Sequence, residues 1–365
     1  MTIILFLVVL AILIFVHELG HFFVAKKSGI RVDEFAIGFP PKIISWVKGE
    51  TKYVLNLIPF GGYVKIFGEN PDDESISGED SKRSFVNAKK WKQVCVLISG
   101  VAMNIIFAWI LFSVSFMFGS MVPVGEGTDN IYAKYIKDSQ VILTSVKADS
   151  PAQKAGLLQG DKLISIDSIG GNTLNPTKVR ELIENSKVKL IVVAYSRAGE
   201  TRYATVTPEI SSDTSKKVIG IYMENVGTVK LNPLIALWEG GKLTILKFKQ
   251  VAVGLGNFLF EVIKGEADFS QVSGPVGIVG MVGDAAHFGL AYFFGFVAFI
   301  SLNLAVINLL PFPALDGGRV VFVIIEAIIR RPIKPKIVNT INTIGFIILI
   351  GLMLIITYRD IMKFF

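Results

Sequence analysis

Four long apolar stretches constrain this 365-residue chain more than any other feature of its sequence. They cover residues 2–25, 93–119, 289–310 and 337–358, and the third continues past a break to residue 330. Each is close to the roughly 20 residues that a helix needs to cross a bilayer. Because 52% of the residues are apolar and only 18% are charged, the sequence predicts a mainly α-helical polytopic membrane protein with four transmembrane segments.

The basic residues gather at the ends of the apolar stretches. Residues 26–92 carry twelve Lys and Arg, and the link before the last stretch carries Arg330, Arg331, Lys334 and Lys336. The positive-inside rule places both segments in the cytoplasm, and residues 120–288 and both termini on the opposite face of the cell membrane. The net charge of +7 therefore indicates membrane topology and contact with lipid, and we expect no nucleic-acid partner.

The first apolar stretch has a signal peptide as its alternative interpretation. No basic residue precedes it and no small-x-small cleavage site follows it, while two histidines and a glutamate lie inside it. We therefore predict a retained first transmembrane helix over residues 1–26.

The motif HELGH at residues 17–21 lies within this first stretch. On a helix, His17 and His21 share a face and can bind one metal ion, with Glu18 beside it to take a proton from water. Ionisable groups cost about 2.5–3.5 kcal/mol each in a bilayer, so they need a compensating role. The sequence predicts a zinc site with Glu18 as general base, and a buried polar network without metal is the alternative.

A catalytic zinc needs a third protein ligand. Two acidic residues lie in apolar surroundings at the cytoplasmic depth of the motif, Asp316 and Glu326. Asp316 is the better candidate because two prolines precede it and two glycines follow it, which predicts a broken helix lining a cavity. An N-cap on the following helix is the alternative role for Asp316.

The segment of residues 27–92 contains the run YVLNLIPFGGYVKIF at residues 53–67. Two β-rich halves flank a Pro-Phe-Gly-Gly turn, which predicts a β-hairpin. Because the run is apolar and adjoins two membrane helices, we expect the hairpin to associate with the membrane. An ordinary cytoplasmic hairpin is the alternative.

Residues 127–225 differ in character, with more charge, shorter apolar runs and recurrent turn residues. They predict a β-rich extracytoplasmic domain inserted between the second and third spans. Its pattern SPAxxAGLxxGDxLxxID, at residues 150–167, resembles PDZ domains of bacterial membrane and periplasmic proteases, with a helix capped by Ser150 or Asp149. Residues 226–288 predict an amphipathic linker that lies along the membrane surface.

Four features together resemble the site-2 proteases, in particular their bacterial sigma-factor-regulating branch. They are HELGH, the NLLPFPALDGG of residues 308–318, the GG-containing hairpin and the PDZ-like insert, so that the resemblance covers nearly the whole chain. It implies that His17, His21 and Asp316 bind zinc and that Glu18 is the base. The implied substrate is a single-span membrane protein, such as an anti-sigma factor, cleaved within the membrane in regulated intramembrane proteolysis.

The resemblance also implies two substrate-binding elements. Asn308 would help to hold the substrate or the developing oxyanion. An edge strand would bind the unwound substrate, and it consists of Pro59, Phe60, Gly61, Gly62, Tyr63 and Val64. In a permuted PDZ-like domain, a peptide ligand would add to the strand near residues 218–223.

Two other functions are consistent with parts of the sequence. One is a catalytically inactive membrane scaffold with a structural metal site, in which the PDZ-like domain binds the partner. The other is a transporter, suggested by the broken helix alone, but the two halves of the chain lack the corresponding repeats that a transporter predicts.

Overall fold

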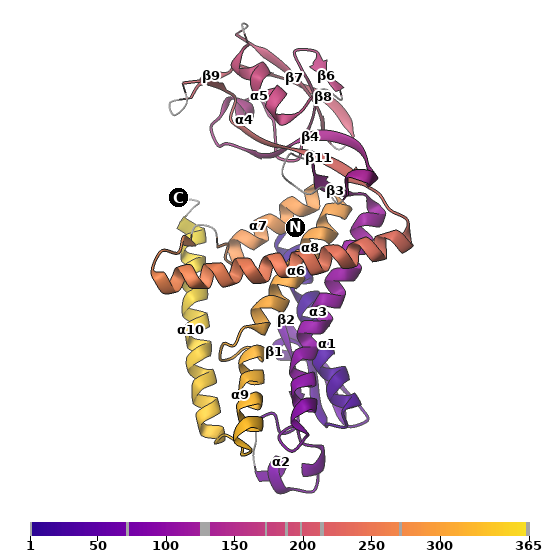
Figure 1. Ribbon diagram of the computed structural model, residues 1–365, viewed down its shortest axis with the longest axis vertical. Coiled ribbons are helices and arrows are strands. Elements are labelled where there is room, and N and C mark those ends of the chain that lie inside the picture. Colours follow the sequence, from indigo (N-terminus) through magenta and orange to yellow (C-terminus); the bar gives the residue numbers. More distant parts are fainter. Residues whose placement is uncertain are drawn as a thin grey trace. The chain divides into compact units, whose positions relative to one another are not determined.

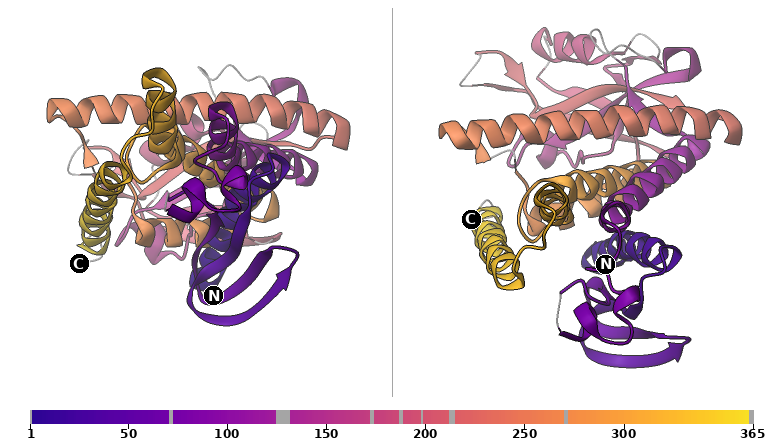
Figure 2. Two further views of the ribbon diagram at one scale, coloured as in Figure 1. Left: turned by 90° about the horizontal axis from the view of Figure 1, so that it is seen from below. Right: turned by 60° about the horizontal axis from the view of Figure 1, so that its bottom comes forward.

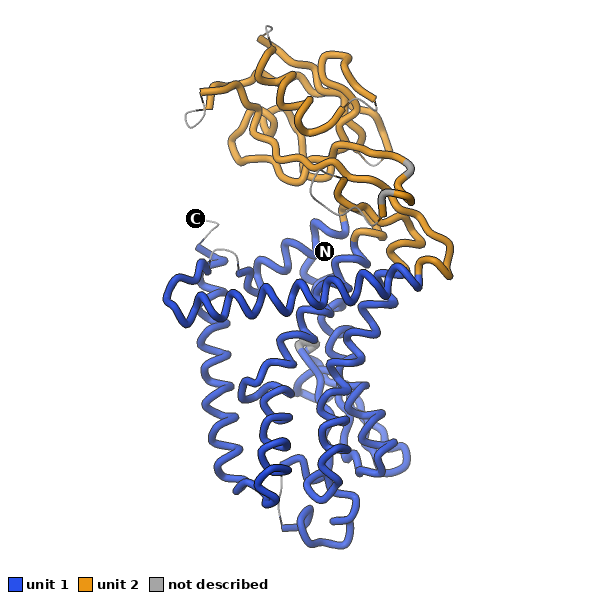
Figure 3. The backbone as a smooth tube through the Cα atoms, viewed as in Figure 1, with its two compact units in different colours: residues 1–113, 237–286, 293–365 blue, residues 114–236, 287–292 orange. Residues whose placement is uncertain are grey.

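The computed structural model describes residues 2–70, 73–124, 132–171, 174–186, 189–197, 199–211, 215–269 and 272–362, apart from the side chains of residues 59, 60, 133 and 137. The chain forms two compact units (Figure 3). The helical unit comprises residues 1–113, 237–286 and 293–365, and the β unit comprises residues 114–236 and 287–292.

Long helices dominate the helical unit (Figure 1). The helices that lie wholly or mainly in it are α1 (Thr2–Lys27), α2 (Asp73–Ser77), α3 (Lys90–Phe118), α6 (Pro233–Lys264), α7 (Pro275–His287), α8 (Leu290–Leu309), α9 (Asp316–Ile329) and α10 (Pro335–Met362). A 3₁₀ turn, Ser81–Arg83, follows α2. Within the described part of the chain, five helices are long and apolar enough to cross a membrane: α1, α3, α6, α8 and α10.

Helix α6 is the one of these five helices that was not among the four spans expected from the sequence. It is the least apolar of the five, and it runs across the other long helices instead of alongside them (Figures 1 and 2). Trp109 Nε1 on α3 donates to the carbonyl of Leu237 at 2.7 Å, and Leu243 and Phe248 pack on the core between α1, α3 and α8.

The strands β1 (Val32–Lys48) and β2 (Thr51–Ile66) correct the predicted hairpin of residues 53–67. The two halves of that run do not pair with each other. Both pair with the first part of β1, one half on each side, so that Phe35 lies opposite both Tyr53 and Val64. Residues 62–66 consequently form an outer strand of this small sheet, with no further strand beyond them among the described residues.

Helix α8 ends at Leu309, and α9 begins at Asp316. The intervening residues 310–315 are not helical, and Ala314 has a positive φ of 73°. Because proline cannot continue a helix and restricts the residue before it, Pro311 and Pro313 account for the break. The glycines after Asp316 then let the break fold back, since a Cβ on Gly317 would lie within 2.6 Å of the Leu309 carbonyl carbon.

Side chains from α1, α3 and α8 form the core that fixes these helices. The buried members are Val9, Leu13, Ala108, Leu111, Phe112, Val297, Ala298 and Leu302. A hydroxyl on α8 strengthens this packing, because Ser301 Oγ donates to the carbonyl of Asn104 on α3 at 2.8 Å. The three helices therefore hold the motif of α1 at a fixed position relative to α3.

The β unit contains a sheet of order β3-β11-β4-β5-β7-β8, with β6 paired to β5 and a separate β9-β10 pair. Its elements are β3 (Ser120–Pro123), a 3₁₀ turn Ala133–Tyr135, β4 (Ile136–Val146), α4 (Pro151–Lys154), β5 (Lys162–Ile166), β6 (Ile169–Gly170), α5 (Pro176–Glu184), β7 (Ile191–Arg197), β8 (Glu200–Val206), β9 (Glu209–Ile210), β10 (Lys217–Val218) and β11 (Ile221–Val229). The unit extends beyond the expected residues 127–225 at both ends.

Two features of the PDZ-like motif hold the β unit together. Ser150 caps α4 by accepting from the Gln153 N–H. Asp161, which is fully buried, accepts from Arg197 Nε at 2.7 Å and from the Leu158 N–H at 2.8 Å. The buried carboxylate is therefore neutralised and hydrogen-bonded, as a buried charge requires.

Candidate metal and catalytic site

Helix α1 places the three polar residues of HELGH together within an apolar helix. His17 and His21 are four residues apart and share one face, and their Nε2 atoms lie 3.2 Å apart. Both side chains are buried, each with 8% of its surface exposed. Glu18 is half-buried and lines the same small cavity as the two imidazoles.

Asp316 follows the break between α8 and α9, and its carboxylate lies against the two histidines. Its Oδ2 lies 3.0 Å from His17 Nε2 and 3.3 Å from His21 Nε2. The N-cap of α9 is Leu315, and Asp316 is the first helical residue, so the alternative role of Asp316 as an N-cap is wrong. The break thus turns the Asp316 carboxylate toward α1.

Glu326, the other acidic candidate, has different partners. Its carboxylate accepts from Lys90 Nζ at 2.6 Å and from the Ile333 N–H at 2.9 Å. The structure therefore brings Asp316 to the histidines and leaves Glu326 bound elsewhere.

The three ligand atoms fit a zinc ion. Their pairwise distances are 3.0, 3.2 and 3.3 Å. Two ligands at about 2.0–2.1 Å from a tetrahedral zinc are separated by roughly 3.3–3.4 Å, which follows from the geometry alone. Two imidazoles and one carboxylate are also a donor set that zinc accepts in catalytic sites. His17, His21 and Asp316 are the only cluster of three such residues in the described part of the chain.

The second ring nitrogen of each histidine is held by α3. His21 Nδ1 lies 2.8 Å from the carbonyl oxygen of Val96, so it carries the proton and donates it. His17 Nδ1 lies 3.1 Å from the amide of Asn104, a fully buried residue. These contacts leave both Nε2 lone pairs free for the metal, as such outer partners do in metal sites.

One orientation of the Asn104 amide fits the His17 tautomer that metal binding at Nε2 requires, in which Nδ1 carries the ring proton and needs an acceptor. With the nitrogen toward His17, the buried Oδ1 has no partner. With the oxygen toward His17, Oδ1 accepts the Nδ1 proton. We therefore assign Oδ1 to that side, since amide oxygen and nitrogen are distinguished by their hydrogen bonds.

Gly100 on α3 lies directly against the two imidazoles. A Cβ at this position would be 2.5 Å from His21 Nε2 and 2.8 Å from His17 Nε2. Any residue larger than glycine would therefore occupy the space of the ligand atoms. Gly20 on α1 has the complementary role, because a Cβ there would be 2.7 Å from the carbonyl carbon of Ser99.

A cavity of about 270 Å³ surrounds the site. Its lining consists of His17, Glu18, His21, Tyr63, Val64, Ile66, Glu69, Leu97, Asp316 and Arg319. The outer strand of β2 forms one wall, where Tyr63, Val64 and Ile66 line the cavity together with Glu18. Gly62 also faces Glu18, since a Cβ there would be 3.6 Å from Glu18 Cγ.

Tyr63 is a neutral donor in this wall. Its hydroxyl donates to Glu34 Oε1, and this hydrogen bond together with partial burial raises the pKa of Tyr63 to about 12. At neutral pH the hydroxyl therefore keeps its proton. Among the other carboxylates of the lining, Asp316 lies against the histidines and Glu69 is paired with Arg319, so Glu18 is the one that can act as a base beside the metal ligands.

Some residues expected to bind substrate are not brought to the cavity. Asn308 is half-buried near the end of α8 and is not among the lining residues. Gly61 also lies outside the lining, while the side chains of Pro59 and Phe60 fall outside the described residues. Sequence reasoning missed Asn104, Gly100 and Arg319, which carry no motif that distinguishes them from other residues of apolar helices.

Comparison with known proteins gives consistent matches over the full length. The profile of Peptidase family M50 matches residues 5–352. A Clostridium perfringens protein named "Putative zinc metalloprotease" is 37% identical over 99% of this chain and 98% of its own length. The regulator of sigma-W protease RasP of Bacillus subtilis is 29% identical over 100% of this chain and 99% of its own.

One solved structure matches a shorter segment. The PDZ domain of an SdrC-like protein from Listeria innocua covers 23% of this chain and 92% of its own, at 24% identity and a TM-score of 0.21.

Proposed function

The chain belongs to Peptidase family M50, as its motifs predicted, and we propose that it hydrolyses a peptide bond within a transmembrane segment of another membrane protein. It is a zinc metalloprotease of the site-2 type. One observation carries this proposal: His17, His21 and Asp316 converge within 3.3 Å beside Glu18, between helices long and apolar enough to span a membrane.

The roles of the site residues follow from their positions. His17, His21 and Asp316 would hold the metal. Zinc, when bound, makes water nucleophilic near neutral pH and polarises a carbonyl group. Glu18 takes the proton from the attacking water on its carboxylate and returns it to the leaving nitrogen.

The outer strand of β2 is the element that would bind the substrate. A helix hides its peptide bonds within its own hydrogen bonds, so the substrate must unwind before water can attack. An unwound segment can add to the free edge of residues 62–66 through backbone hydrogen bonds. Because Gly62 and Val64 lie against Glu18, this strand would present the scissile bond to the base. Asn308 stays a prediction as a substrate contact.

The arrangement in the membrane is part of the proposal. We place the active site toward the cytoplasm and the β unit outside the cell, because the basic residues cluster in residues 26–92 and 330–336. Four helices, α1, α3, α8 and α10, would be spanning, with the third segment continuing through the break into α9. Helix α6 would lie along the outer membrane surface, which its course across the other helices supports.

The β unit would act as a PDZ-like domain. Residues 221–224 of β11 pair with β4 on one side, and no strand among the described residues pairs with them on the other side, where β3 pairs with residues 226–229 and the Val124 N–H donates to the Asn225 carbonyl. That free edge could accept a peptide. The natural substrate would be a single-span regulator such as an anti-sigma factor, as the name of the B. subtilis relative suggests.

The test is to map the bond that is cut. A purified single-span substrate, tagged at both ends, would be incubated with the enzyme in detergent and its fragments measured by mass spectrometry. We expect the cut inside the apolar span. A cut only in the soluble flanks would contradict intramembrane hydrolysis.

A further inference from the structure

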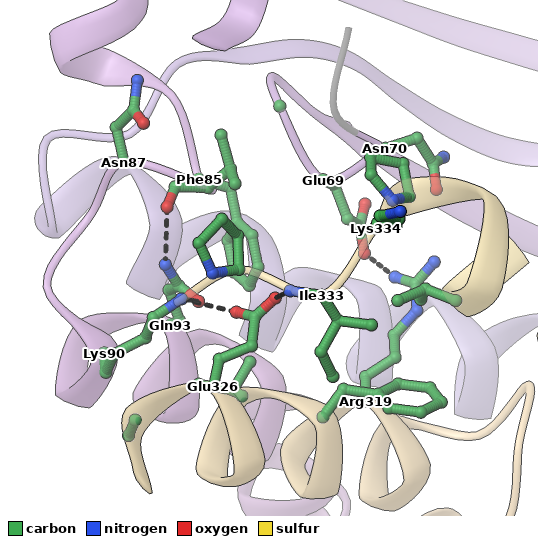
Figure 4. A pocket seen from close by; sticks show the side chains of 18 of the residues that line it. Glu69, Asn70, Phe85, Asn87, Lys90, Gln93, Arg319, Glu326, Ile333 and Lys334 are labelled. Atoms are coloured by element: carbon green, nitrogen blue, oxygen red, sulfur yellow. Dashed lines mark hydrogen bonds and ion pairs between the residues drawn. The ribbon is translucent and has the colours of Figure 1, made fainter. Parts of the chain in front are cut away.

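A second and larger cavity lies beside the catalytic one in the helical unit (Figure 4). Its volume is about 650 Å³, within the range of roughly 300–1,000 Å³ that is usual for ligand pockets. It is bounded by the loop after β2, the start of α3, the length of α9 and the link to α10. Its apolar lining includes Phe85, Leu97, Phe322, Val323, Ile333 and Val338.

The charges around this cavity do not balance. Two carboxylates line it, and each is paired: Glu326 with Lys90 at 2.6 Å and Glu69 with Arg319. Three further cations line it and have no ion-pair partner among the described residues: Arg330, Arg331 and Lys334. All three are exposed at the end of α9 and in the link to α10. The cavity therefore joins an apolar interior to a positive rim whose charges are unpaired among the described residues.

The two cavities share part of their walls. Glu69, Leu97 and Arg319 line both of them. The chain of β2 leads from one to the other, because Val64 and Ile66 line the catalytic cavity and Gly68 lines the larger one. A substrate extended along the outer strand of β2 would therefore leave the catalytic cavity at Glu69 and Arg319 and enter the larger cavity.

We propose that the larger cavity binds the part of the substrate that adjoins the scissile bond, and that Arg331 and Lys334 select substrates with an acidic residue in that part. The apolar walls receive the end of the unwound span, and the positive rim receives a carboxylate just outside it. Because a misplaced lysine would meet the same rim, the rim also disfavours basic substrates. This proposal rests on the proposed function of the site.

The pairs Glu69–Arg319 and Lys90–Glu326 give the cavity its fixed shape. The Ile333 N–H also donates to Glu326, so that α3, α9 and the link to α10 are tied at one carboxylate. The opposite wall is held by Asn87, whose amide donates to the carbonyls of Ser75, Ile76 and Ser81. The rim cations are thus mounted on fixed elements, which a charge-selecting site requires.

The experiment uses paired single-span substrates that carry Asp or Lys at one flanking position. The position is moved outward on each side of the mapped scissile bond, over about eight residues, which span roughly 26 Å when extended. Cleavage rates are measured for the wild type, Arg331→Glu, Lys334→Glu and Lys336→Glu. Lys336 is the matched control, because it lies two residues from Lys334, in the first turn of α10, is exposed, and does not line the cavity.

On one flank only, we expect the wild type to cut the Asp substrate roughly two- to fivefold faster than the Lys substrate, the range for partly exposed ion pairs. Arg331→Glu and Lys334→Glu should abolish or invert this ratio, and Lys336→Glu should keep it. The proposal is wrong if the ratio of the Asp-substrate rate to the Lys-substrate rate is the same in all four proteins. It is also wrong if Lys336→Glu changes this ratio as Lys334→Glu does.

Two further outcomes separate the alternatives. If cleavage in vesicles depends on the fraction of anionic phospholipid, and Lys334→Glu removes that dependence without any effect of substrate charge, the cavity binds lipid and the proposal is wrong. If the wild type cuts no substrate, the proposed function fails. If it cuts every substrate at the same rate, the proposed protease function is supported and the proposed role of the larger cavity is wrong.

Discussion

Gly100 is the position where a single methyl group tests the metal site most sharply. The Gly100→Ala substitution adds a Cβ at 2.5 Å from His21 Nε2 and 2.8 Å from His17 Nε2. Ordinary contact between such atoms needs about 3.5 Å, so the imidazoles must move by roughly 1 Å. Metal–ligand distances are held within about 0.2 Å, and neither histidine can then keep its position.

The loss of zinc affinity has a lower bound. Disturbing only an outer partner of a zinc ligand costs about 10–100-fold in affinity, and here both ligands are displaced. We therefore expect Gly100→Ala to weaken zinc binding by at least about 100-fold. Alanine is the better helix former by about 0.8–1.0 kcal/mol, so α3 itself should not lose stability.

The assay is competition with a zinc chelator, together with circular dichroism to show that the helices are intact. Gly351→Ala on α10 is the control, because a Cβ at Gly351 meets nothing within 4 Å. That control should bind zinc as the wild type does. Wild-type zinc affinity in Gly100→Ala would refute the packing of α3 against the imidazoles.

Substitutions at three other positions have defined outcomes. Asp316→Asn removes the anionic ligand and should lower the zinc content of the purified protein, measured by atomic emission, whereas unchanged content would exclude Asp316 as a ligand. Asn104→Leu should weaken zinc binding about 10–100-fold in chelator competition. Asn104→Asp keeps an acceptor for His17 Nδ1 and should retain more zinc affinity than Asn104→Leu. Equal losses of affinity in the two variants would contradict the assigned amide orientation. Asp161→Asn weakens the pairing with Arg197 and should destabilise the β unit by about 1–3 kcal/mol, seen as faster hydrogen exchange in that unit alone, and unchanged exchange would refute it.

The three residues that the structure brings together at the site can be singled out from the sequence alone. HELGH is local, and the helical period alone places His17 and His21 on one face. Asp316 is far away in sequence but stands in a break of prolines and glycines within an apolar stretch, where an acidic residue is costly without a partner. Both signals depend on few residues, so they could be recognised without knowing the packing.

The partners supplied by α3 could not be predicted in the same way. Asn104 and Gly100 are single small or polar residues in an apolar helix, and such residues occur for many packing reasons. Their roles depend on the register of α3 against α1, which rests on the fit of Gly20 against Ser99 and on the shared core with α8. Side-chain packing between helices is not encoded in any short motif.

The pairing of the β-strands shows a second limit. The two halves of residues 53–67 have the alternating pattern of strands and a glycine turn between them, which favours a hairpin. The pattern does not say which strand is the partner, and residues 32–37 insert between the halves. Residues 32–48 contain Pro40, Pro41 and two lysines, which obscure their strand pattern.

The central claim is that Glu18 is the base of a zinc protease, and one comparison tests it directly. Cleavage of a tagged single-span substrate is measured for the wild type and Glu18→Gln in detergent, with bound zinc quantified in both. We predict that Glu18→Gln keeps about one zinc per chain, because Glu18 is not among the three ligands, and loses cleavage. Equal cleavage by both proteins, or full activity in zinc-free protein, would contradict the mechanism.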